Sequence, residues 1–167
     1  MIVRAVSLAD AAAMTGWQNA VVRIGGTIVQ DEARRETEET RDHLTGPWVL
    51  CCPVAVAAGG AAGFQALWRH PDSPEDRGDI GTYVRAGLHR SGLGAALFAA
   101  TADRARAYGL WSINPTIRAD NAAGPGCYAR CCLVDDDHAA DCALKDGRVM
   151  GRVSGRFAGT VNPAATR

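Results

Sequence analysis

The sequence lacks a charge excess of either sign and any long hydrophobic run. Its 167 residues include 18 lysines and arginines against 18 aspartates and glutamates, so the formal net charge is zero. A broad nucleic-acid-binding surface needs a basic excess, and a transmembrane helix needs about 20 consecutive apolar residues. Residues 1–5 are too short and too strand-like for a signal peptide. We therefore expect a cytoplasmic protein whose partners are neither nucleic acid nor a membrane.

Two common phosphate-binding motifs are also absent. The sequence has no Gly-Lys-Ser/Thr segment, which a P-loop requires. A dinucleotide-binding fingerprint needs a small residue where this chain has Leu97, and an acidic residue about 20 positions further on. Residues 113–116 of this chain read Ile-Asn-Pro-Thr and offer no acid. The sequence therefore argues against both of these phosphate-binding folds.

Cysteine is present, but its pattern is not that of a secreted disulfide framework. Two adjacent pairs, 51–52 and 131–132, occur among the six cysteines, which are Cys51, Cys52, Cys127, Cys131, Cys132 and Cys142. Four side chains could form a zinc site, namely those of Cys127, Cys131, His138 and Cys142. Three residues separate the first two, however, and both fall in an expected helix, whereas structural zinc sites usually have tighter pairs on loops. We expect reduced, buried thiols and no metal.

The hydrophobic patterns predict one α/β (α+β) domain, residues 1–167, with a frayed tail from about residue 158. Ser7 is expected to cap the first helix. Strands are expected at 1–6, 48–56, 61–69, 79–85, 111–117, 133–144 and 148–157, and helices at 8–22, 31–44, 93–108 and 121–131. The alternation of these elements predicts a mixed sheet with helices on its faces.

Residues 31–44 are densely charged, with glutamate and arginine three or four positions apart. This spacing is typical of a solvent-exposed helix without a chemical role. The alternative is a lid over a substrate pocket.

The segment 88–98 is the most informative part of the chain. Gly92 and Gly94 stand between a strand-like run, residues 80–84, and an alanine-rich helical pattern. A glycine-bearing turn that opens a helix directs backbone N–H groups outward, where the helix dipole adds to their attraction for phosphate. Ser91 is expected to cap this helix. The alternative is an ordinary loop whose glycines serve only the turn.

This segment resembles a known cofactor-binding motif. Residues 89–94, His-Arg-Ser-Gly-Leu-Gly, are similar to Gln/Arg-x-x-Gly-x-Gly/Ala, the coenzyme A pyrophosphate loop of the GNAT acetyltransferase superfamily, with His89 in place of Gln or Arg. The segments 121–123 and 128–133 resemble the superfamily's Asn-x-x-(small) and Tyr-x-x-x-Gly-Phe signatures. They depart from these at Cys132-Leu133 and at the Gly-Pro-Gly of 124–126. Segments 119–123 and 151–157 resemble the phosphinothricin and amino-acid N-acetyltransferase branch.

The resemblance implies a mainly antiparallel mixed sheet flanked by helices, acetyl-CoA as co-substrate, and a set of site residues. Tyr128 would protonate the departing thiolate, and Asp79 would deprotonate the amine. His70 and His43 are rival bases, because imidazole titrates near neutrality. The cofactor would lie between the strands that contain Asp79 and Trp111. Its contacts would come from Tyr83, Val84, Arg85, His89, Arg90, Ser91, Gly92, Leu93, Gly94, Ala95 and Asn121.

The expected activity is therefore transfer of an acetyl group from acetyl-CoA to the primary amine of a small, amino-acid-like molecule. Two alternatives stay open: a peptide or protein amine as acceptor, and a non-catalytic acyl-CoA-binding module. The expected partners are the small-molecule amine and, as a further option, a second copy of the chain in a homodimer.

Overall fold

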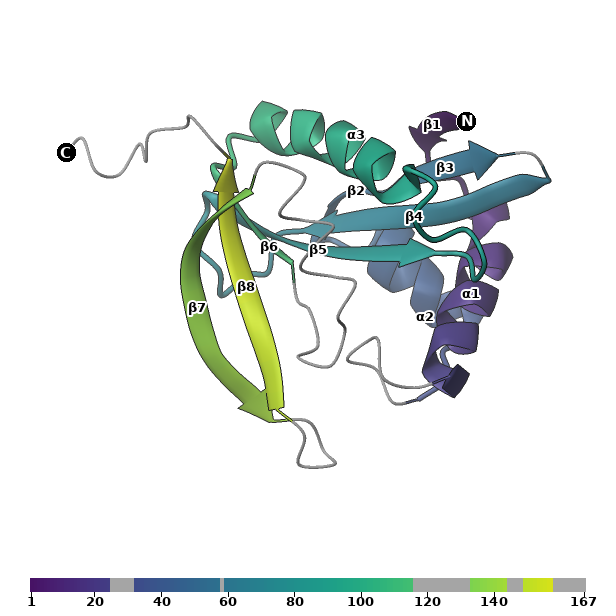
Figure 1. The fold of residues 1–167 in the computed structure, drawn as a ribbon, viewed down its shortest axis with the longest axis horizontal. Coiled ribbons are helices and arrows are strands. Elements are labelled where there is room, and N and C mark those ends of the chain that lie inside the picture. The colour runs from purple at the N-terminus through teal and green to yellow at the C-terminus, as the bar shows by residue number, and fades with distance from the viewer. Residues whose placement is uncertain (25–31, 58, 116–132, 144–148, 158–167) are drawn as a thin grey trace.

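A central sheet organises the fold (Figure 1). The structure is a computed structural model that describes residues 1–24, 32–57, 59–115, 133–143 and 149–157, the last two ranges by their backbone. The strands occur in the spatial order β1 (Ile2–Ala5), β3 (Pro53–Ala57), β4 (Gly60–Trp68), β5 (Arg77–Val84), β6 (Ser112–Pro115), β8 (Val149–Phe157) and β7 (Leu133–Ala143), while β2 (Val49–Cys51) pairs with β4.

The sheet is mixed and mainly antiparallel, which confirms the expected fold class. Only β5 and β6 run parallel among the described pairs, and their register joins Arg77–Ile80 to Ser112–Pro115. A parallel connection needs a crossover, and the chain makes it through α3 (Leu93–Ala107). The two strands at the centre of the sheet therefore begin side by side, with a helix between them in sequence.

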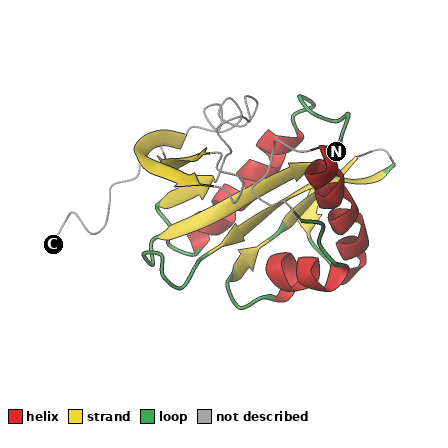
Figure 2. Cartoon of the chain, turned by 90° about the horizontal axis from the view of Figure 1, so that it is seen from below, coloured by secondary structure: helices red, strands yellow, loops and turns green. Residues whose placement is uncertain are grey.

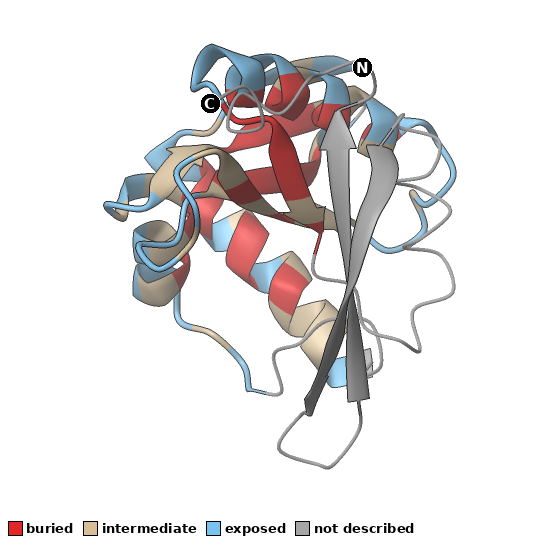
Figure 3. Ribbon diagram, turned by 90° about the vertical axis from the view of Figure 1, so that its left-hand side faces the viewer, coloured by how far each residue is buried: buried red, intermediate tan, exposed pale blue. Residues whose placement is uncertain are grey.

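The helices cover the two faces of the sheet (Figures 1 and 2). On one face, α3 packs through Leu97 and Phe98 against apolar residues of β3, β4, β5 and β6. On the other face, α1 (Ala11–Ile24) packs through Met14 and Trp17 against Phe64 and its neighbours. The short helix α2 (Glu36–Thr40) and the π-helix η2 (Arg41–Thr45) lie on this second face as well. Buried residues gather in the strands between these helices (Figure 3).

A short turn, η1 (Leu8–Asp10), precedes α1, so the expected first helix has two parts. Ser7 stands at its N-terminal boundary, as expected. The backbone N–H and the hydroxyl of Ser7 both donate to the Asp10 carboxylate at 2.8 Å, and the Arg4 guanidinium donates to the same carboxylate through two hydrogen bonds of 2.8 Å. These bonds hold the pKa of Asp10 well below its usual range, the Arg4 hydrogen bond being the largest cause.

The charged segment differs from its prediction. Its helix begins at Glu36 rather than at residue 31, and Glu39 and His43 are buried. The prediction of a fully solvent-exposed helix is therefore wrong at these two positions, because one side of α2 and η2 packs on the sheet. The segment expected as one strand, 48–56, forms β2 and β3, and the pairing of β2 with β4 shifts in register between Val49 and Cys51.

The remaining elements agree with the sequence within a few residues. The terminal strand pair, β7 and β8, is antiparallel as expected. The expected helix 121–131 and the tail from 158 lie outside the described residues. Among the residues that the structure describes, no helix has the length and apolar character needed to cross a membrane.

Candidate active site

The loop between β5 and α3 has the backbone geometry of a helix-opening turn. Three of its residues adopt positive φ angles: Gly87 at 83°, Arg90 at 64° and Gly92 at 84°. Gly92 is the N-cap of α3, and a Cβ built on it would meet no atom within 4 Å. Glycine is needed at this position for its left-handed backbone, not for lack of space.

Ser91 does not cap α3, contrary to the prediction. Its hydroxyl instead donates to the carbonyl of Leu88 at 2.6 Å, which closes the loop on itself. The first helical hydrogen bond runs from the Ala96 N–H to the Gly92 carbonyl at 3.0 Å. The N–H groups of Leu93, Gly94 and Ala95 precede it and have no acceptor within the helix. They form the set of outward donors that a phosphate group requires.

The loop is solvent-accessible but firmly anchored. His89, Arg90, Ser91 and Gly92 are all exposed. Leu93 is 3% exposed and packs with Ala55, Ala62 and Leu97. The buried leucine fixes the start of the helix, while His89 and Arg90 of the loop stay exposed to solvent.

The backbone N–H and C=O groups of residues 83–85 point alternately toward β4 and away from it. The Arg85 N–H donates to the Ala62 carbonyl at 2.9 Å, so Arg85 directs its N–H toward β4. Because successive residues of a strand direct their N–H and C=O groups to opposite sides, Tyr83 shares the direction of Arg85 and Val84 does not. Of the three residues expected to hold the arm of the cofactor, Val84 alone directs its backbone groups away from β4.

Asp79 lies in the middle of the sheet. It is half-buried on β5, opposite Trp68 of β4 and Asn114 of β6. Side chains two and four positions apart on a strand share a face. Asp79 therefore shares a face with Gly81 and Tyr83, the face on which α1 and α2 pack.

Tyr83 is a protonated phenol in this site. Its hydroxyl accepts a hydrogen bond from the Gln18 side-chain amide at 3.3 Å. Burial, with a smaller contribution from the negative charge of Glu39, raises the pKa of Tyr83 to about 12. The ring stacks on Phe64, with 4.6 Å between the centroids. Tyr83 therefore serves as a neutral, fixed wall beside Asp79.

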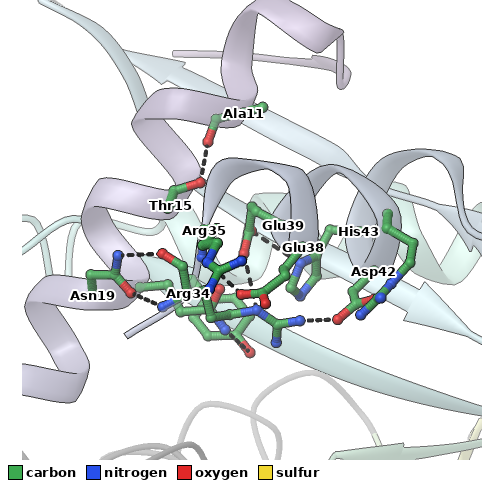
Figure 4. A network of polar contacts seen from close by, with 12 residues as sticks. Ala11, Thr15, Asn19, Arg34, Arg35, Glu38, Glu39, Asp42 and His43 are labelled. Atoms are coloured by element: carbon green, nitrogen blue, oxygen red, sulfur yellow. Dashed lines mark hydrogen bonds and ion pairs between the residues drawn. The ribbon is translucent and has the colours of Figure 1, made fainter. Parts of the chain in front are cut away.

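Behind this wall is a buried polar cluster that the sequence did not reveal (Figure 4). The His43 Nδ1 and Glu39 Oε1 atoms are 3.0 Å apart, and both side chains are almost fully buried. The Arg34 Nε atom is 3.8 Å from the other oxygen of Glu39, and the Arg34 guanidinium also pairs with Asp42. The four-residue spacing of Glu39 and His43 was the available signal, since it places both on one side of a helix.

Trp68 connects this cluster to the strand that contains Asp79. Its indole N–H donates to the Asp42 carbonyl at 2.5 Å, and its ring centroid is 5.1 Å from that of His43. A Cβ built on Gly81 would be only 3.1 Å from the Trp68 ring and 3.2 Å from the Tyr83 ring. Gly81 therefore allows the two aromatic rings to approach the strand beside Asp79, a role that its place in the sequence did not indicate.

The rival bases are poorly placed. The His43 side chain is 2% exposed and lies among the rings of Phe64, Trp68 and Tyr83, so a substrate has no access to it. The His70 side chain is 60% exposed in the loop before β5, with Asp72 at 3.5 Å. Asp79, by contrast, is half-buried at the centre of the sheet.

Two expected site residues, Tyr128 and Asn121, lie outside the described residues. So do Cys127 and Cys131 of the alternative zinc site, and of His138 and Cys142 only the backbone is described. Within the described part of the chain, no cluster of His, Cys, Asp or Glu suits a metal ion. Cys51 and Cys52 are free thiols, and burial raises the pKa of both, that of Cys51 to about 11.

Comparison with known proteins gives one family and many similar folds. The acetyltransferase (GNAT) family model matches residues 22–132, more than half of the chain. No curated protein sequence matches. A putative acetyltransferase from Salmonella typhimurium, yncA, solved with its cofactor acetyl-CoA, is 22% identical, with a TM-score of 0.78 over 97% of this chain and 96% of that one.

Two further structures are similar at lower identity. A phosphinothricin acetyltransferase from Sinorhizobium meliloti, in complex with acetyl-CoA, is 16% identical, with a TM-score of 0.78 over 96% of this chain and 91% of that one. A ribosomal-protein-alanine N-acetyltransferase from Brucella melitensis is 19% identical, with a TM-score of 0.76 over 93% and 98%. At these identities the structures show a shared fold.

Proposed function

Because the chain belongs to the acetyltransferase (GNAT) family, we propose that it moves an acetyl group from acetyl-CoA to the primary amine of a small, amino-acid-like molecule. The similar folds from Salmonella typhimurium and Sinorhizobium meliloti were both solved with acetyl-CoA, which supports acetyl-CoA as the donor here. The phosphinothricin acetyltransferase among them supports a small acceptor.

The loop before α3 is the observation that carries the proposal. Its outward N–H groups follow directly from the strand that contains Asp79. A pyrophosphate bound at residues 92–95, with Arg90 beside it, would leave the rest of the cofactor free to extend along β5 past Val84. The reacting thioester would then lie near Asp79.

The reaction requires one proton to leave the amine and one to reach the thiolate. We assign the first role to Asp79, directly or through water, and the second to Tyr128. The deprotonated nitrogen attacks the thioester carbonyl carbon, a C–N bond forms, and the C–S bond breaks. Tyr128 then donates its phenolic proton to the sulfur of coenzyme A, and the second proton, which the nitrogen loses as the amide forms, restores the Tyr128 phenol. Asn121 would hold the cofactor from the side opposite β5.

The binding site can be tested without knowledge of the acceptor. Gly94→Glu places a side chain and a negative charge at the outward donors, and we expect it to abolish acetyl-CoA binding in calorimetry. Gly16→Glu adds the same group to α1 at an exposed position with no atom within 4 Å, and it should bind acetyl-CoA as the wild type does. Circular dichroism should show an unchanged fold in both variants. Unchanged affinity in Gly94→Glu would contradict the site.

The acceptor class requires a separate assay. Thiol release from acetyl-CoA should rise with at least one member of an amino-acid panel. If thiol release rises only with peptides that have a free N-terminus, the result would favour a peptide or protein amine as the acceptor. The similarity to a ribosomal-protein-alanine N-acetyltransferase is the reason to test this alternative. Acetyl-CoA binding without thiol release from either panel would favour the non-catalytic binding module. A homodimer and a cytoplasmic location stay predictions.

A further inference from the structure

Asn114 occupies a position in the sheet next to the proposed base. It lies on β6, the strand that runs parallel to β5, and its partner in the register is Asp79. Neighbouring strands lie about 4.8 Å apart, and registered residues of a parallel pair direct their side chains to the same face. Asn114 and Asp79 are therefore adjacent side chains, contributed by strands that α3 separates in sequence.

The face that these two residues share is the one opposite α3. Ile80 and Ile113, the neighbours of Asp79 and Asn114 in sequence, both pack in the cluster beneath α3. Since side chains alternate along a strand, Asp79 and Asn114 point to the other face. Trp68 and Tyr83 belong to that face as well. Asn114 thus adds a polar group to the aromatic surroundings of Asp79.

The side-chain oxygen of Asn114 is buried, and no donor among the residues that the structure describes forms a hydrogen bond with it. A buried acceptor without a partner is costly, because it has lost its hydrogen bonds to water. Such groups are rare in folded proteins and call for a specific explanation, such as a function at that site. The oxygen requires a donor that is not part of the described protein.

We propose that the Asn114 side-chain oxygen binds the amino group of the acceptor beside Asp79. This inference rests on the proposed function and deepens it. An alkylammonium group has three N–H donors, so it can donate to Asp79 and to Asn114 at once. When one proton passes to Asp79, the neutral amine keeps its hydrogen bond to Asn114, and its lone pair is free to attack the thioester carbonyl carbon.

This arrangement selects the chemical class of the acceptor. An alcohol has one O–H donor and can satisfy only one of the two oxygens. A primary amine can satisfy both, and a site with two paired acceptors rejects ligands that leave one of them without a donor. Asn114 therefore favours primary amines over alcohols of the same shape and orients the nitrogen for attack.

A binding experiment tests this directly, with n-butylammonium chloride as the probe and n-butanol as its uncharged analogue. In ¹⁵N-labelled wild-type protein, the Asn114 side-chain amide resonance should shift saturably with n-butylammonium and not with n-butanol. Asn114→Leu removes the acceptor at similar size and should weaken binding by about tenfold or more, because a hydrogen bond to a charged group is lost. Asn114→Asp keeps an acceptor oxygen and should retain binding. Ser112→Ala, two residues away on the same strand, is the matched control.

Activity provides the second readout, with the amino acid that releases most thiol in the panel. Asn114→Leu should lower kcat/KM for that amine about 10- to 100-fold while the affinity for acetyl-CoA stays unchanged. Equal binding of n-butylammonium and n-butanol, or an Asn114→Leu variant that binds as the wild type does, would overturn the inference while leaving the proposed function intact. A saturable n-butylammonium shift at Asn114 without thiol release from any amine would support the inference and contradict the proposed function.

Discussion

At the scale of the residue, the titratable groups of the site differ in their surroundings, and these differences decide which of them can act as the base. Tyr83 is half-buried, stacks on Phe64 and accepts a hydrogen bond from Gln18, and its phenol, with a pKa raised to about 12, is neutral at physiological pH. Asp79, four positions earlier on the same face, is half-buried and central. His43 is enclosed by aromatic rings. This leaves a carboxylate as the candidate base on this face of the described site, and Tyr128 as the expected acid.

The role of Tyr128 predicts a specific kinetic change. Tyr128→Phe removes only the hydroxyl, so turnover should fall by roughly 10²–10⁴-fold, the usual contribution of a general acid. Acetyl-CoA affinity, measured by calorimetry, should change little. Tyr108→Phe is the matched control, since the Tyr108 hydroxyl donates to the Leu50 carbonyl at 3.1 Å in an exposed position. Near-normal turnover of Tyr128→Phe would show that another group protonates the thiolate.

The role of Asp79 predicts a change in the pH–rate profile. A base must be ionised to accept the proton, so the rate should rise with pH through its pKa. Asp79→Asn should remove this acidic limb or shift it toward the pKa of the amine itself. Asp72→Asn changes a side chain that is 90% exposed and should leave the limb in place. The measurement is kcat/KM against pH for the best amine of the panel.

At the scale of the element, the turn η1 before α1 depends on one carboxylate. Asp10 accepts hydrogen bonds from Arg4 and Ser7, and these lower its pKa in the folded state. A lowered pKa stabilises the fold at pH values above that of an unfolded aspartate, and the stabilisation is lost as the pH falls toward the folded-state pKa. At neutral pH the ionised Asp10 carboxylate therefore links Arg4 of β1 to the turn that precedes α1.

The expected consequence is a stability difference that depends on pH. Asp10→Asn should lower the free energy of unfolding at pH 7 by about 1 kcal/mol, a modest figure because Arg4 is 43% exposed. The difference from wild type should shrink between pH 5 and pH 3. Asp103→Asn removes an ion pair in which both side chains are mostly exposed, and it should change little at any pH. Urea unfolding at several pH values provides the measurement, and a constant difference would contradict the assignment.

At the scale of the element, the structure also shows which features sequence patterns predict and which they do not. Within the described residues, the order of strands and helices follows from local alternation, spacing and turn residues, apart from the division of 48–56 into two strands, and so do the strand pair β7 and β8 and the glycine turn before α3. The burial of Glu39 and His43 does not. Their charge pattern is that of an exposed helix, and only contact with Phe64, Trp68 and Tyr83, on distant strands, makes that side of the helix an interior surface.

The cap of α3 illustrates a second limit. Ser91 and Gly92 are both residue types that begin helices, and the sequence favoured the serine. The structure selects the glycine because the loop enters the helix through a positive φ angle, which glycine adopts at little cost. Similarly, nothing in the short sequence of β6 marks Asn114 as a site residue, and only its register places it beside Asp79. Pairing across a crossover is a property of the tertiary structure.

At the scale of the whole molecule, one buried cluster connects elements that are distant in sequence. Arg34 contacts Glu39 and Asp42, and its backbone exchanges hydrogen bonds of 2.7 and 2.9 Å with the Asn19 side chain of α1. Trp68 of β4 donates to the Asp42 carbonyl. The cluster thereby fixes α1 and α2 against the face of the sheet that contains Asp79, so the fold and the site depend on the same contacts.

Glu39 is the centre of this cluster, which makes it the residue whose loss should affect the whole fold. Glu39→Ala leaves Arg34 and His43 without the carboxylate between them, and removing one partner of a buried ion pair is strongly destabilising. We expect a loss of about 3 kcal/mol in the free energy of unfolding, measured as a lower urea midpoint in a cooperative transition. Glu36→Ala, an exposed position on the same helix, should change it by less than about 0.5 kcal/mol. If the two variants unfold at the same urea concentration, the cluster does not hold the helices to the sheet, and the geometry around Asp79 must be maintained by the apolar contacts of α1 alone.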